Sequence, residues 1–317
     1  MKIINLIGDE LSPDGLKEQF ALDVLIGLSS KPKRISPKYF YNDQGSELFQ
    51  QITESEDYYL TNLEFEILKK HANKIAETLI KSTCVIDLIE LGAGDGRKTS
   101  ILVNALNDAG IKINYFPIDI SKEAMEQMKD FLTESDSFNI SGIVAEYFQG
   151  LNYLRDHSSN PKLLLFLGSN IGNFDRGQAA GFMRRAWRVL NSNDWLLLGA
   201  DLKKEIDVLH RAYNDSKGIT RKFNLNLLTR INNELGGNFN LDAFDHYGSY
   251  NPLLGAMESF LLSRQKQSVY IEELEKDFLF KAFEPIHMEY STKYLDEELA
   301  YLGKASGFSV EESYYDE

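Results

Sequence analysis

Between residues 63 and 201 the chain alternates short, almost wholly apolar segments with segments whose apolar residues recur at helical spacing. This alternation limits the possible folds more than any other feature of the sequence. The apolar segments, which we predict to be strands, cover residues 85–91, 115–120, 140–144, 163–167 and 195–199. Strand, helix and strand repeated in this order predict an α/β fold, with a parallel sheet and helices on both faces.

A helix is predicted immediately before the first of these strands, over residues 61–80. Thr61 and Glu64 have the spacing of a capping box, in which each side chain pairs with the backbone amide of the other residue. Apolar residues then recur at helical spacing from Phe65 to Leu79. We therefore expect Thr61 to cap an amphipathic helix that packs on the sheet.

The pattern changes after residue 201. Residues 202–286 contain two helix-like stretches and then alternating segments of the kind that form antiparallel hairpins. We predict a second, inserted α+β domain over 202–286, which the N-terminal segment 1–62 joins. The α/β core then comprises residues 63–201. Residues 287–317 return to this core, with a helix near 295–305 and a strand at 308–310.

A glycine-rich loop joins the first predicted strand to its helix. Gly92, Gly94 and Gly96 follow the strand directly, and at the carboxyl end of a parallel sheet such a loop lets the backbone approach a nucleotide. A tight turn without a ligand would use the same residues. Asp119, which ends the second predicted strand, adds a carboxylate suited to ribose hydroxyls. Together the two features predict a nucleoside cofactor.

The spacing of the glycines distinguishes between two cofactors. A dinucleotide loop needs Gly-x-Gly-x-x-Gly so that pyrophosphate meets a helix N-terminus. Here the third glycine comes one residue earlier, and Asp95 would repel a diphosphate. S-adenosyl-L-methionine carries a sulfonium cation and no phosphate, so that Glu90 and Asp95 are tolerable near it. We therefore favour S-adenosyl-L-methionine over a nicotinamide.

Composition excludes several partner classes. The 34 basic and 48 acidic residues give a net charge of −14, which lacks the basic field that nucleic-acid binding needs. The single cysteine, Cys84, is predicted to be buried; it excludes an intrachain disulfide and a cysteine-based zinc site, and the five histidines have no metal spacing. No apolar run is long enough to span a bilayer, and no signal peptide is visible. We expect a cytoplasmic protein without metal, nucleic-acid or membrane partners.

Longer motifs are distributed along the chain. The first is KYFYNDQGSELF at residues 38–49, followed by Tyr58-Tyr59-x-Thr61. After the glycine loop come GSNIGNF at 168–174, RAYND at 211–215 and EYSTKY at 289–294. In content and order these motifs resemble the ergothioneine-pathway L-histidine Nα-methyltransferases over almost the whole chain. The resemblance implies a Rossmann-like class I methyltransferase core with an inserted α+β substrate-binding domain.

The resemblance also implies cofactor contacts. The glycine loop, with Gly92 and Gly94, and Asp119 would hold S-adenosyl-L-methionine, and Lys98 matches a further cofactor contact of the family. Where the family has an Asp-Phe pair against the adenine, this chain has Glu146 and Tyr147. The chain also ends where this fold generally continues into a final antiparallel strand, so we expect an open sheet edge.

Six residues match family positions that hold the amino acid: Tyr58, Asn173, Tyr213, Met257, Glu289 and Ser291. Tyr58 and Asn173 are the catalytic candidates, and Asn173 would also hold the α-amino acid end. Glu289 and Ser291 lie two positions apart, so that on a strand they face the same way and can hold the two nitrogens of an imidazole. Packing for the tyrosines, a loop turn for Asn173 and a solvated strand face remain alternatives.

The function that follows is methylation of the α-amine of L-histidine, up to three times, to give hercynine in ergothioneine biosynthesis. One alternative is a catalytically silent sensor or partner protein that binds S-adenosyl-L-methionine. Another is an N-methyltransferase for a different amino acid or a tryptophan-derived amine, since fungal enzymes acting on dimethylallyltryptophan share the fold. A monomer is slightly favoured.

Overall fold

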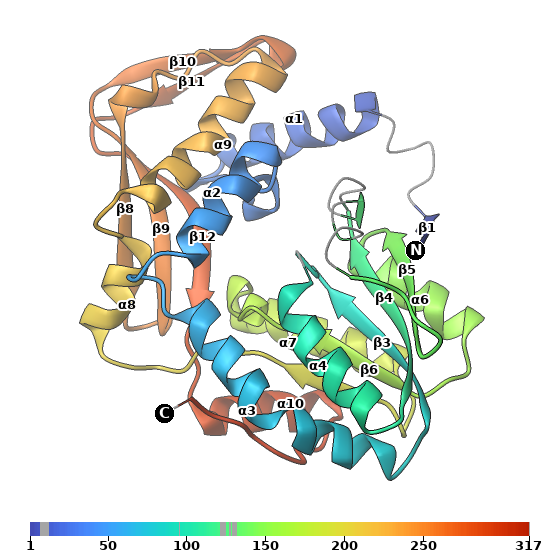
Figure 1. Ribbon diagram of the computed structural model, residues 1–317. Coiled ribbons are helices and arrows are strands. Elements are labelled where there is room, and N and C mark those ends of the chain that lie inside the picture. The colour runs from blue at the N-terminus through green and yellow to red at the C-terminus, as the bar shows by residue number, and fades with distance from the viewer. Residues whose placement is uncertain (7–12, 95, 121–124, 127, 129–131, 317) are drawn as a thin grey trace. The chain divides into compact units, whose positions relative to one another are not determined.

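The structure is a computed structural model of residues 1–317, and it describes all of them except 7–12, 95, 121–124, 127, 129–131 and 317 (Figure 1). The chain divides into two compact units. Unit 1 comprises Met1–Gly8, Thr61–Asp201 and Tyr294–Glu317. Unit 2 comprises Asp9–Leu60 and Leu202–Lys293. Both units are therefore assembled from separate stretches of the chain.

Unit 1 is an α/β unit built around one sheet. Its strands are β1 (Lys2–Asn5), β3 (Val85–Leu91), β4 (Lys112–Asp119), β5 (Phe138–Val144), β6 (Lys162–Phe166) and β7 (Trp195–Leu198). Its helices include α3 (Leu60–Ile80), α4 (Arg97–Asp108), α6 (Tyr147–His157), the 3₁₀ helix η4 (Asn170–Asn173), α7 (Arg176–Val189) and α10 (Asp296–Ser306). Each of the five strands predicted in the core is present within a few residues.

The six strands lie in the order β1-β5-β4-β3-β6-β7, and all of their pairings are parallel. From β3 the chain proceeds outward through β4 and β5 on one side and through β6 and β7 on the other. This doubly wound order is Rossmann-like, and its direction reverses between β3 and β6. The predicted fold class is confirmed, and the loops after β3 and β6 flank the point where such sheets bind ligands.

Alternate residues of the strands pack under different helices. Ile86 and Leu88 of β3 belong to a core that contains buried residues of α3 and α4. On the other face, Phe166 of β6 stacks on Phe182 of α7 with ring centroids 4.3 Å apart. The helices α6 and α10 both pack against α7, and Figure 1 shows the sheet between these layers. The expected coverage of both faces is therefore present.

Two expectations for unit 1 were wrong, and one strand was not predicted. Residues 2–5 form β1 beside β5, although the sequence gave no sign of a strand there. Residues 308–310 form no strand, because Gly307 adopts a φ of 102° and the Phe308 amide bonds the Gly303 carbonyl to end α10. Cys84 is exposed, since it lies in the turn between α3 and β3.

Unit 2 is an α+β unit. Its helices are α1 (Pro13–Ser29), the 3₁₀ helix η2 (Pro37–Tyr39), α2 (Asp43–Thr53), α8 (Ile206–Tyr213), α9 (Ile219–Leu235) and the 3₁₀ helices η5 (Leu241–Ala243) and η6 (Glu272–Leu274). Its strands are β2 (Lys33–Arg34), β8 (Phe244–Asn251), β9 (Ala256–Ser263), β10 (Gln267–Ile271), β11 (Lys276–Phe280) and β12 (Pro285–Thr292). The predicted antiparallel hairpins are present as β8–β9 and β10–β11.

A four-stranded sheet with the order β2-β12-β9-β8 carries three of the predicted substrate residues, Met257, Glu289 and Ser291. The long motif at residues 38–49 builds the helix beside it. Asn42 caps α2 by accepting from the Gly45 amide at 2.9 Å, and its Oδ1 also accepts from Asn226 of α9 at 2.8 Å. A Cβ on Gly45 would lie 1.8 Å from the Phe40 carbonyl oxygen. Much of this motif therefore serves packing between α2 and α9.

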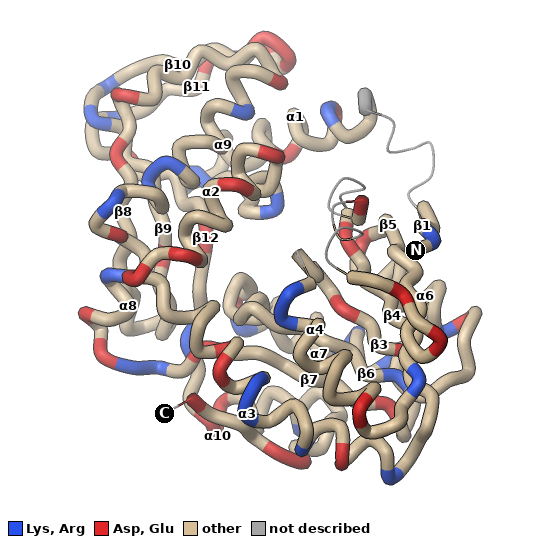
Figure 2. Tube along the Cα trace, in the orientation of Figure 1, with Lys and Arg blue, Asp and Glu red and all other residues tan. Residues whose placement is uncertain are grey.

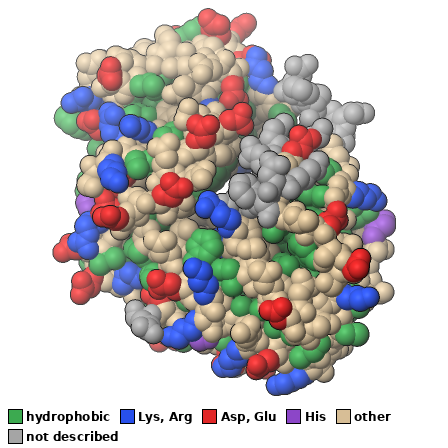
Figure 3. Space-filling model, viewed as in Figure 1, with side chains coloured by type: hydrophobic (Ala, Val, Ile, Leu, Met, Phe, Trp, Pro, Cys, Tyr) green, Lys and Arg blue, Asp and Glu red, His purple; other side chains and the backbone are tan. Residues whose placement is uncertain are grey.

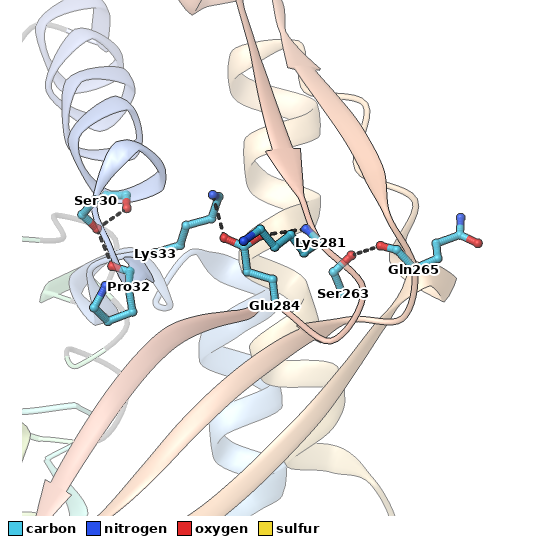
Figure 4. A network of polar contacts seen from close by, with 8 residues as sticks. Ser30, Pro32, Lys33, Ser263, Gln265, Lys281 and Glu284 are labelled. Atoms are coloured by element: carbon cyan, nitrogen blue, oxygen red, sulfur yellow. Dashed lines mark hydrogen bonds and ion pairs between the residues drawn. The ribbon is translucent and has the colours of Figure 1, made fainter.

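A small polar network secures the edge of this sheet (Figure 4). Lys33 of β2 forms an ion pair with Glu284 at 2.9 Å, and the Lys281 amide donates to the other Glu284 oxygen at 2.7 Å. Ser30 donates to the Pro32 carbonyl at 2.7 Å, just before β2. These contacts hold the two-residue strand against the start of β12.

The observed division of the chain differs from the predicted domain boundaries. Residues 287–293 belong to unit 2, because β12 pairs with β9 and β2 and not with the parallel sheet. The return to unit 1 comes at Tyr294, and within the N-terminal segment 1–62 the first eight residues belong to unit 1. The assignment of unit 2 to substrate binding stays a prediction.

Candidate functional site

The glycine loop after β3 has an open, left-handed backbone. Gly92, Gly94 and Gly96 have φ values of 68°, 57° and 72°, which glycine adopts at little cost. A Cβ at Gly92 would lie 2.9 Å from the Tyr147 hydroxyl, whereas one at Gly94 would meet nothing within 4 Å. Among the three glycines, only Gly94 therefore has open space beside its backbone, while Tyr147 packs against Gly92; Asp95 lies outside the described residues.

A second loop follows β6 and carries Asn173. Gly168 has a φ of 75°, and Ser169 has a φ of 56°, which is unusual for a residue with a side chain. The Ser169 hydroxyl accepts from the Asp201 amide at 3.0 Å and so holds this conformation. Asn173 ends η4 half-buried, and no described residue bonds its side-chain amide. The amide therefore remains available to a ligand.

Glu64 connects this second loop to two helices. Its Oε1 accepts from the Gly168 amide at 2.7 Å, and its Oε2 pairs with the Lys98 ammonium at 2.5 Å. The predicted capping box is wrong, because α3 begins at Leu60 and places Thr61 inside the helix. The Glu64 carboxylate thus links α3 to α4 and to the loop after β6, and does not cap α3. Sequence reasoning missed this, since an acid in a first helical turn is typical of capping.

Asp119, Glu146 and Tyr147 follow β4 and β5. Asp119 is half-buried at the end of β4, and its carbonyl accepts from the Ala145 amide at 2.9 Å. Burial raises the pKa of Tyr147, and the charges of Asp119 and Glu146 raise it further. Glu146 itself is exposed and lines a surface pocket with Phe148, Gln149, Asn152 and Arg185. Its contact with a cofactor stays a prediction.

Glu90, another acid near the glycine loop, takes part in hydrogen bonds within the fold. It is 3% exposed, and its Oε2 accepts from Thr99 and Tyr115, both at 2.5 Å. Burial raises the pKa of Glu90, while these two hydrogen bonds oppose the rise. Glu90 therefore ties β3 to α4 and β4 and does not need a ligand.

The described residues of unit 1 fit S-adenosyl-L-methionine better than a dinucleotide. The loops after β3 and β6 offer backbone without Cβ atoms at Gly92, Gly94 and Gly168. The acid that ends β4 suits ribose hydroxyls, and the one lysine in the described part of these loops and their helix starts, Lys98, is already paired with Glu64. Arg97, the first residue of α4, is a second cation beside this loop, so charge alone does not exclude a pyrophosphate. The Gly-x-Gly-x-Gly spacing, which departs from that of a dinucleotide loop, favours S-adenosyl-L-methionine.

In unit 2, Tyr213, Ser291 and Lys293 form one buried cluster. The Tyr213 hydroxyl donates to Ser291 Oγ at 2.5 Å, and the Lys293 ammonium donates to Tyr213 at 3.0 Å and to Ser291 at 2.9 Å. Lys293 is 0% exposed. Sequence reasoning placed Lys293 in a motif without giving it a role, because no local pattern shows that its side chain is buried.

Residues of the RAYND motif position Tyr213. Asn214 exchanges two hydrogen bonds with the backbone of Gly248 in β8, at 2.9 and 3.1 Å. His246 of the same strand bonds the Tyr213 carbonyl at 2.8 Å. Asp215 accepts from the Ile219 and Thr220 amides, at 2.8 and 2.7 Å, and so starts α9. The motif thus locks the end of α8 onto the sheet and directs Tyr213 toward β12.

Glu289 lies two residues before Ser291 on β12, so that both side chains leave the same face of the strand. Burial raises the pKa of Glu289 to about 7, although the Lys293 charge opposes the rise. No described residue donates a hydrogen bond to the Glu289 carboxylate. A half-buried acid without a donor is the kind of group that a ligand N–H can satisfy.

Met257 and Tyr58 complete the face. Met257 is the partner of Ser291 in the β9–β12 register and is fully buried with Leu209, Ala212 and Tyr213. Tyr58 packs on this cluster. Unit 2 therefore gathers five of the six predicted substrate residues, while Asn173 belongs to unit 1.

Two further findings concern the whole described chain. No group of three or more His, Cys, Asp or Glu side chains among the described residues could hold a metal ion. Within the same residues, no helix is long and apolar enough to cross a membrane. In both units basic and acidic residues are interspersed along the trace, and the face in view carries no continuous basic area among the residues described (Figures 2 and 3).

The sequence matches one protein family and several characterised relatives. Residues 20–317 match the family described as histidine-specific, SAM-dependent methyltransferase. Histidine N-alpha-methyltransferase of Mycolicibacterium smegmatis is 34% identical over 92% of this chain and 89% of its own length. Ergothioneine biosynthesis protein 1 of Neurospora crassa is 38% identical over 65% of this chain and 23% of its own length.

A further relative is named for a different substrate. The 4-dimethylallyltryptophan N-methyltransferase of Claviceps purpurea is 29% identical over 89% of this chain and 86% of its own length. The family match covers more of the chain than any one motif, and it agrees with the doubly wound sheet of unit 1. The chain therefore belongs to the histidine-specific, S-adenosylmethionine-dependent methyltransferases.

Proposed function

We propose that the protein transfers methyl groups from S-adenosyl-L-methionine to the α-amine of L-histidine and adds three of them, which gives hercynine. The family match supports the reaction. The observation that carries the substrate is the β12 face, from which Glu289, whose carboxylate no described residue hydrogen-bonds, and Ser291 both project. A carboxylate and a hydroxyl of this kind suit the two nitrogens of an imidazole.

When bound, S-adenosyl-L-methionine supplies a methyl group activated by the sulfonium. In unit 1, Asp119 accepts from the ribose hydroxyls, and the loop with Gly92 and Gly94 approaches the cofactor through its backbone. Lys98, Glu146 and Tyr147 are the further residues proposed to contact it. The carboxylates of this region match the positive charge of the sulfonium.

The residues of unit 2 hold the side chain of the amino acid. Glu289 and Ser291 take the ring nitrogens, and Met257 forms an apolar wall. Tyr213 and Asn173 bind the α-amino acid end. Methyl transfer then requires a neutral amine held in line with the methyl carbon, which is catalysis by positioning. Tyr58 and Asn173 orient this amine, and Tyr58 lies on the route by which its proton leaves.

The direct test incubates the protein with S-adenosyl-L-methionine and each amino acid in turn, and follows products by mass spectrometry. We expect histidine to gain one, two and three methyl groups. The variant Asp119→Ala, which removes the ribose acceptor, is the control that should lose turnover. Absence of methylated histidine with the intact protein would contradict the proposal. Calorimetric binding of the cofactor without turnover would instead support a silent binding protein.

Substrate choice gives a second test. Glu289→Ala should weaken transition-state binding of histidine by about 1–3 kcal/mol, the cost of leaving a buried polar group unpaired. Tryptophan and phenylalanine should lose much less, because their rings do not need this acceptor. Asn173→Ala should depress all amino acids together. An unchanged ratio of histidine to tryptophan turnover in Glu289→Ala would show that Glu289 does not hold the imidazole, and the identity of the substrate would have to be determined anew.

We also propose that the protein works in the cytoplasm as a monomer and without a nucleic-acid partner. The net charge of −14 supports the last point. Size-exclusion chromatography with light scattering, run with and without added DNA, tests the monomeric state and the absence of DNA binding. A dimer would contradict the first, and a complex with DNA would contradict the second.

A further inference from the structure

The buried cluster of Tyr213, Ser291 and Lys293 restricts how Ser291 can bind a ligand. A lysine ammonium has three donors and no acceptor, so that both hydroxyl oxygens must accept from Lys293. The Tyr213 hydroxyl in turn donates to Ser291 Oγ. Ser291 Oγ therefore accepts from two donors, at 2.5 and 2.9 Å. A hydroxyl oxygen has two lone pairs, and both are used.

Only the hydrogen of the Ser291 hydroxyl remains for a ligand. Glu289 has the opposite character when it is ionised, because a carboxylate only accepts. The two side chains leave the same face of β12 and are two residues apart. This face thus presents one donor and one acceptor in a fixed order.

We propose that Lys293 is a positioning residue that sets substrate specificity: by donating to Tyr213 and Ser291, it makes Ser291 a donor toward the ligand. The face then selects a ring with one N–H, for Glu289, and one unprotonated nitrogen, for Ser291. This rests on the proposed function, and within it the neutral imidazole is selected over both imidazolium and rings that carry only an N–H. Lys293 acts through Ser291 and does not itself touch the substrate.

The contacts of Lys293 suit this role. Its backbone amide donates to the Gly255 carbonyl at 2.8 Å, which fixes the residue at the end of β12. Its ammonium also lies 4.9 Å from the centroid of the Tyr213 ring. A fully buried ammonium is costly unless it is hydrogen-bonded, and the Tyr213 and Ser291 hydroxyls are acceptors that reduce this cost. The same two hydrogen bonds fix the direction of the Ser291 hydrogen.

The test compares histidine with β-(pyrrol-2-yl)alanine, whose ring keeps an N–H and replaces the unprotonated nitrogen by C–H. In the intact protein, histidine should be preferred by about tenfold in kcat/KM and in calorimetric affinity, the effect of one buried hydrogen bond. In Lys293→Met the Ser291 hydrogen can turn toward Tyr213, and the preference should fall to about two- or threefold. Lys276→Met, an exposed lysine of the same unit, should keep the tenfold preference.

A double-variant cycle separates positioning from a structural role. Ser291→Ala alone should lower the preference as Lys293→Met does, and adding Lys293→Met to Ser291→Ala should not change it further. A Lys293→Met variant that loses both substrates equally, or keeps the full preference, would overturn the proposal. If Lys293→Met does not fold, Ser291→Ala decides alone, because an unchanged preference there would also overturn it. Failure of the intact protein to methylate histidine would count against the proposed function instead.

Discussion

Unit 1 and unit 2 each gather predicted site residues, but with different parts of the chain. In unit 1 the candidate site consists of loops at the carboxyl ends of parallel strands, where Gly92 and Gly168 expose backbone. Its buried acid, Glu90, is satisfied within the fold. In unit 2 the candidate site is a face of β12 that carries Glu289 and is followed directly by the buried Lys293. The first kind of site depends on backbone conformation and the second on desolvated charge, so the two should respond differently to substitution.

The largest expected effect concerns the carboxylate that ties the loops of unit 1. Glu64→Ala removes the partner of the Gly168 amide and of Lys98, and leaves a half-buried ammonium without its counter-charge. We expect a loss of about 3 kcal/mol in the free energy of unfolding, together with weaker cofactor binding. Denaturant unfolding and calorimetry measure the two. Glu66→Gln, at an exposed acid of the same helix, is the matched control. An equal loss of stability in this control would show that the contacts of Glu64 with Gly168 and Lys98 are not the cause.

The next prediction tests whether the ionised Glu289 carboxylate lowers the stability of unit 2. The pKa of Glu289 in the folded protein, about 7, lies above its ordinary value of 4.5, so the fold disfavours the ionised form. Glu289 therefore lowers stability progressively as the pH rises from 4.5 to about 7, and the penalty is complete above that window.

Glu289→Gln mimics the protonated form and should be more stable than the intact protein above this window, by on the order of 2 kcal/mol. The difference should vanish at pH values below 4.5. Thermal unfolding over this pH range measures it. A variant that is less stable than the intact protein at high pH would show that the carboxylate is satisfied, contrary to the comparison of the two units.

A third prediction tests the backbone site of unit 1. Gly92→Ala forces a side chain onto a φ of 68° and places its Cβ 2.9 Å from the Tyr147 hydroxyl. The left-handed conformation alone costs about 1–2 kcal/mol. Gly110→Ala is the matched control, because Gly110 has a φ of 84° and no atom within 4 Å of the added Cβ. We expect both variants to lose stability and only Gly92→Ala to lose affinity for S-adenosyl-L-methionine. Equal affinity losses would refute a local role.

The smallest effect is expected at the edge of the unit 2 sheet. Burial raises the pKa of Glu284, but hydrogen bonds from the Lys281 amide and the Lys33 ammonium outweigh this effect and hold the pKa below its ordinary value of 4.5. Glu284 thus contributes stability above pH 4.5, which is lost as the pH falls further. Lys33→Met should cost less than about 1 kcal/mol at neutral pH. Lys281→Met keeps the amide contact and should cost less still; pH-dependent unfolding that ranks the two variants in the opposite order would contradict this.

The two units also differ in how far their sites could be predicted. The glycine loop and Asp119 of unit 1 follow from local pattern, since a strand, a run of glycines and a helix are adjacent in the chain. Tyr58, Tyr213, Met257 and Ser291 are distributed over more than two hundred residues, and only the resemblance to a family pointed to them. Their roles, like those of Asn173 and Glu289, stay predictions.

The sequence by itself determined the parallel α/β core, the inserted hairpins and the family, because strand and helix periodicities and contiguous motifs are local properties. Tertiary structure alone decided four other features. β1 joins the sheet because β5 offers a free edge. Glu64 does not form the predicted capping box, because the Gly168 amide and Lys98 lie within hydrogen-bond distance of its carboxylate. β12 joins the second sheet through pairing with β9. The burial of Lys293 belongs with them. Each depends on which distant segments meet, and pairing and desolvation between segments far apart in the chain leave no periodic trace in the residues themselves.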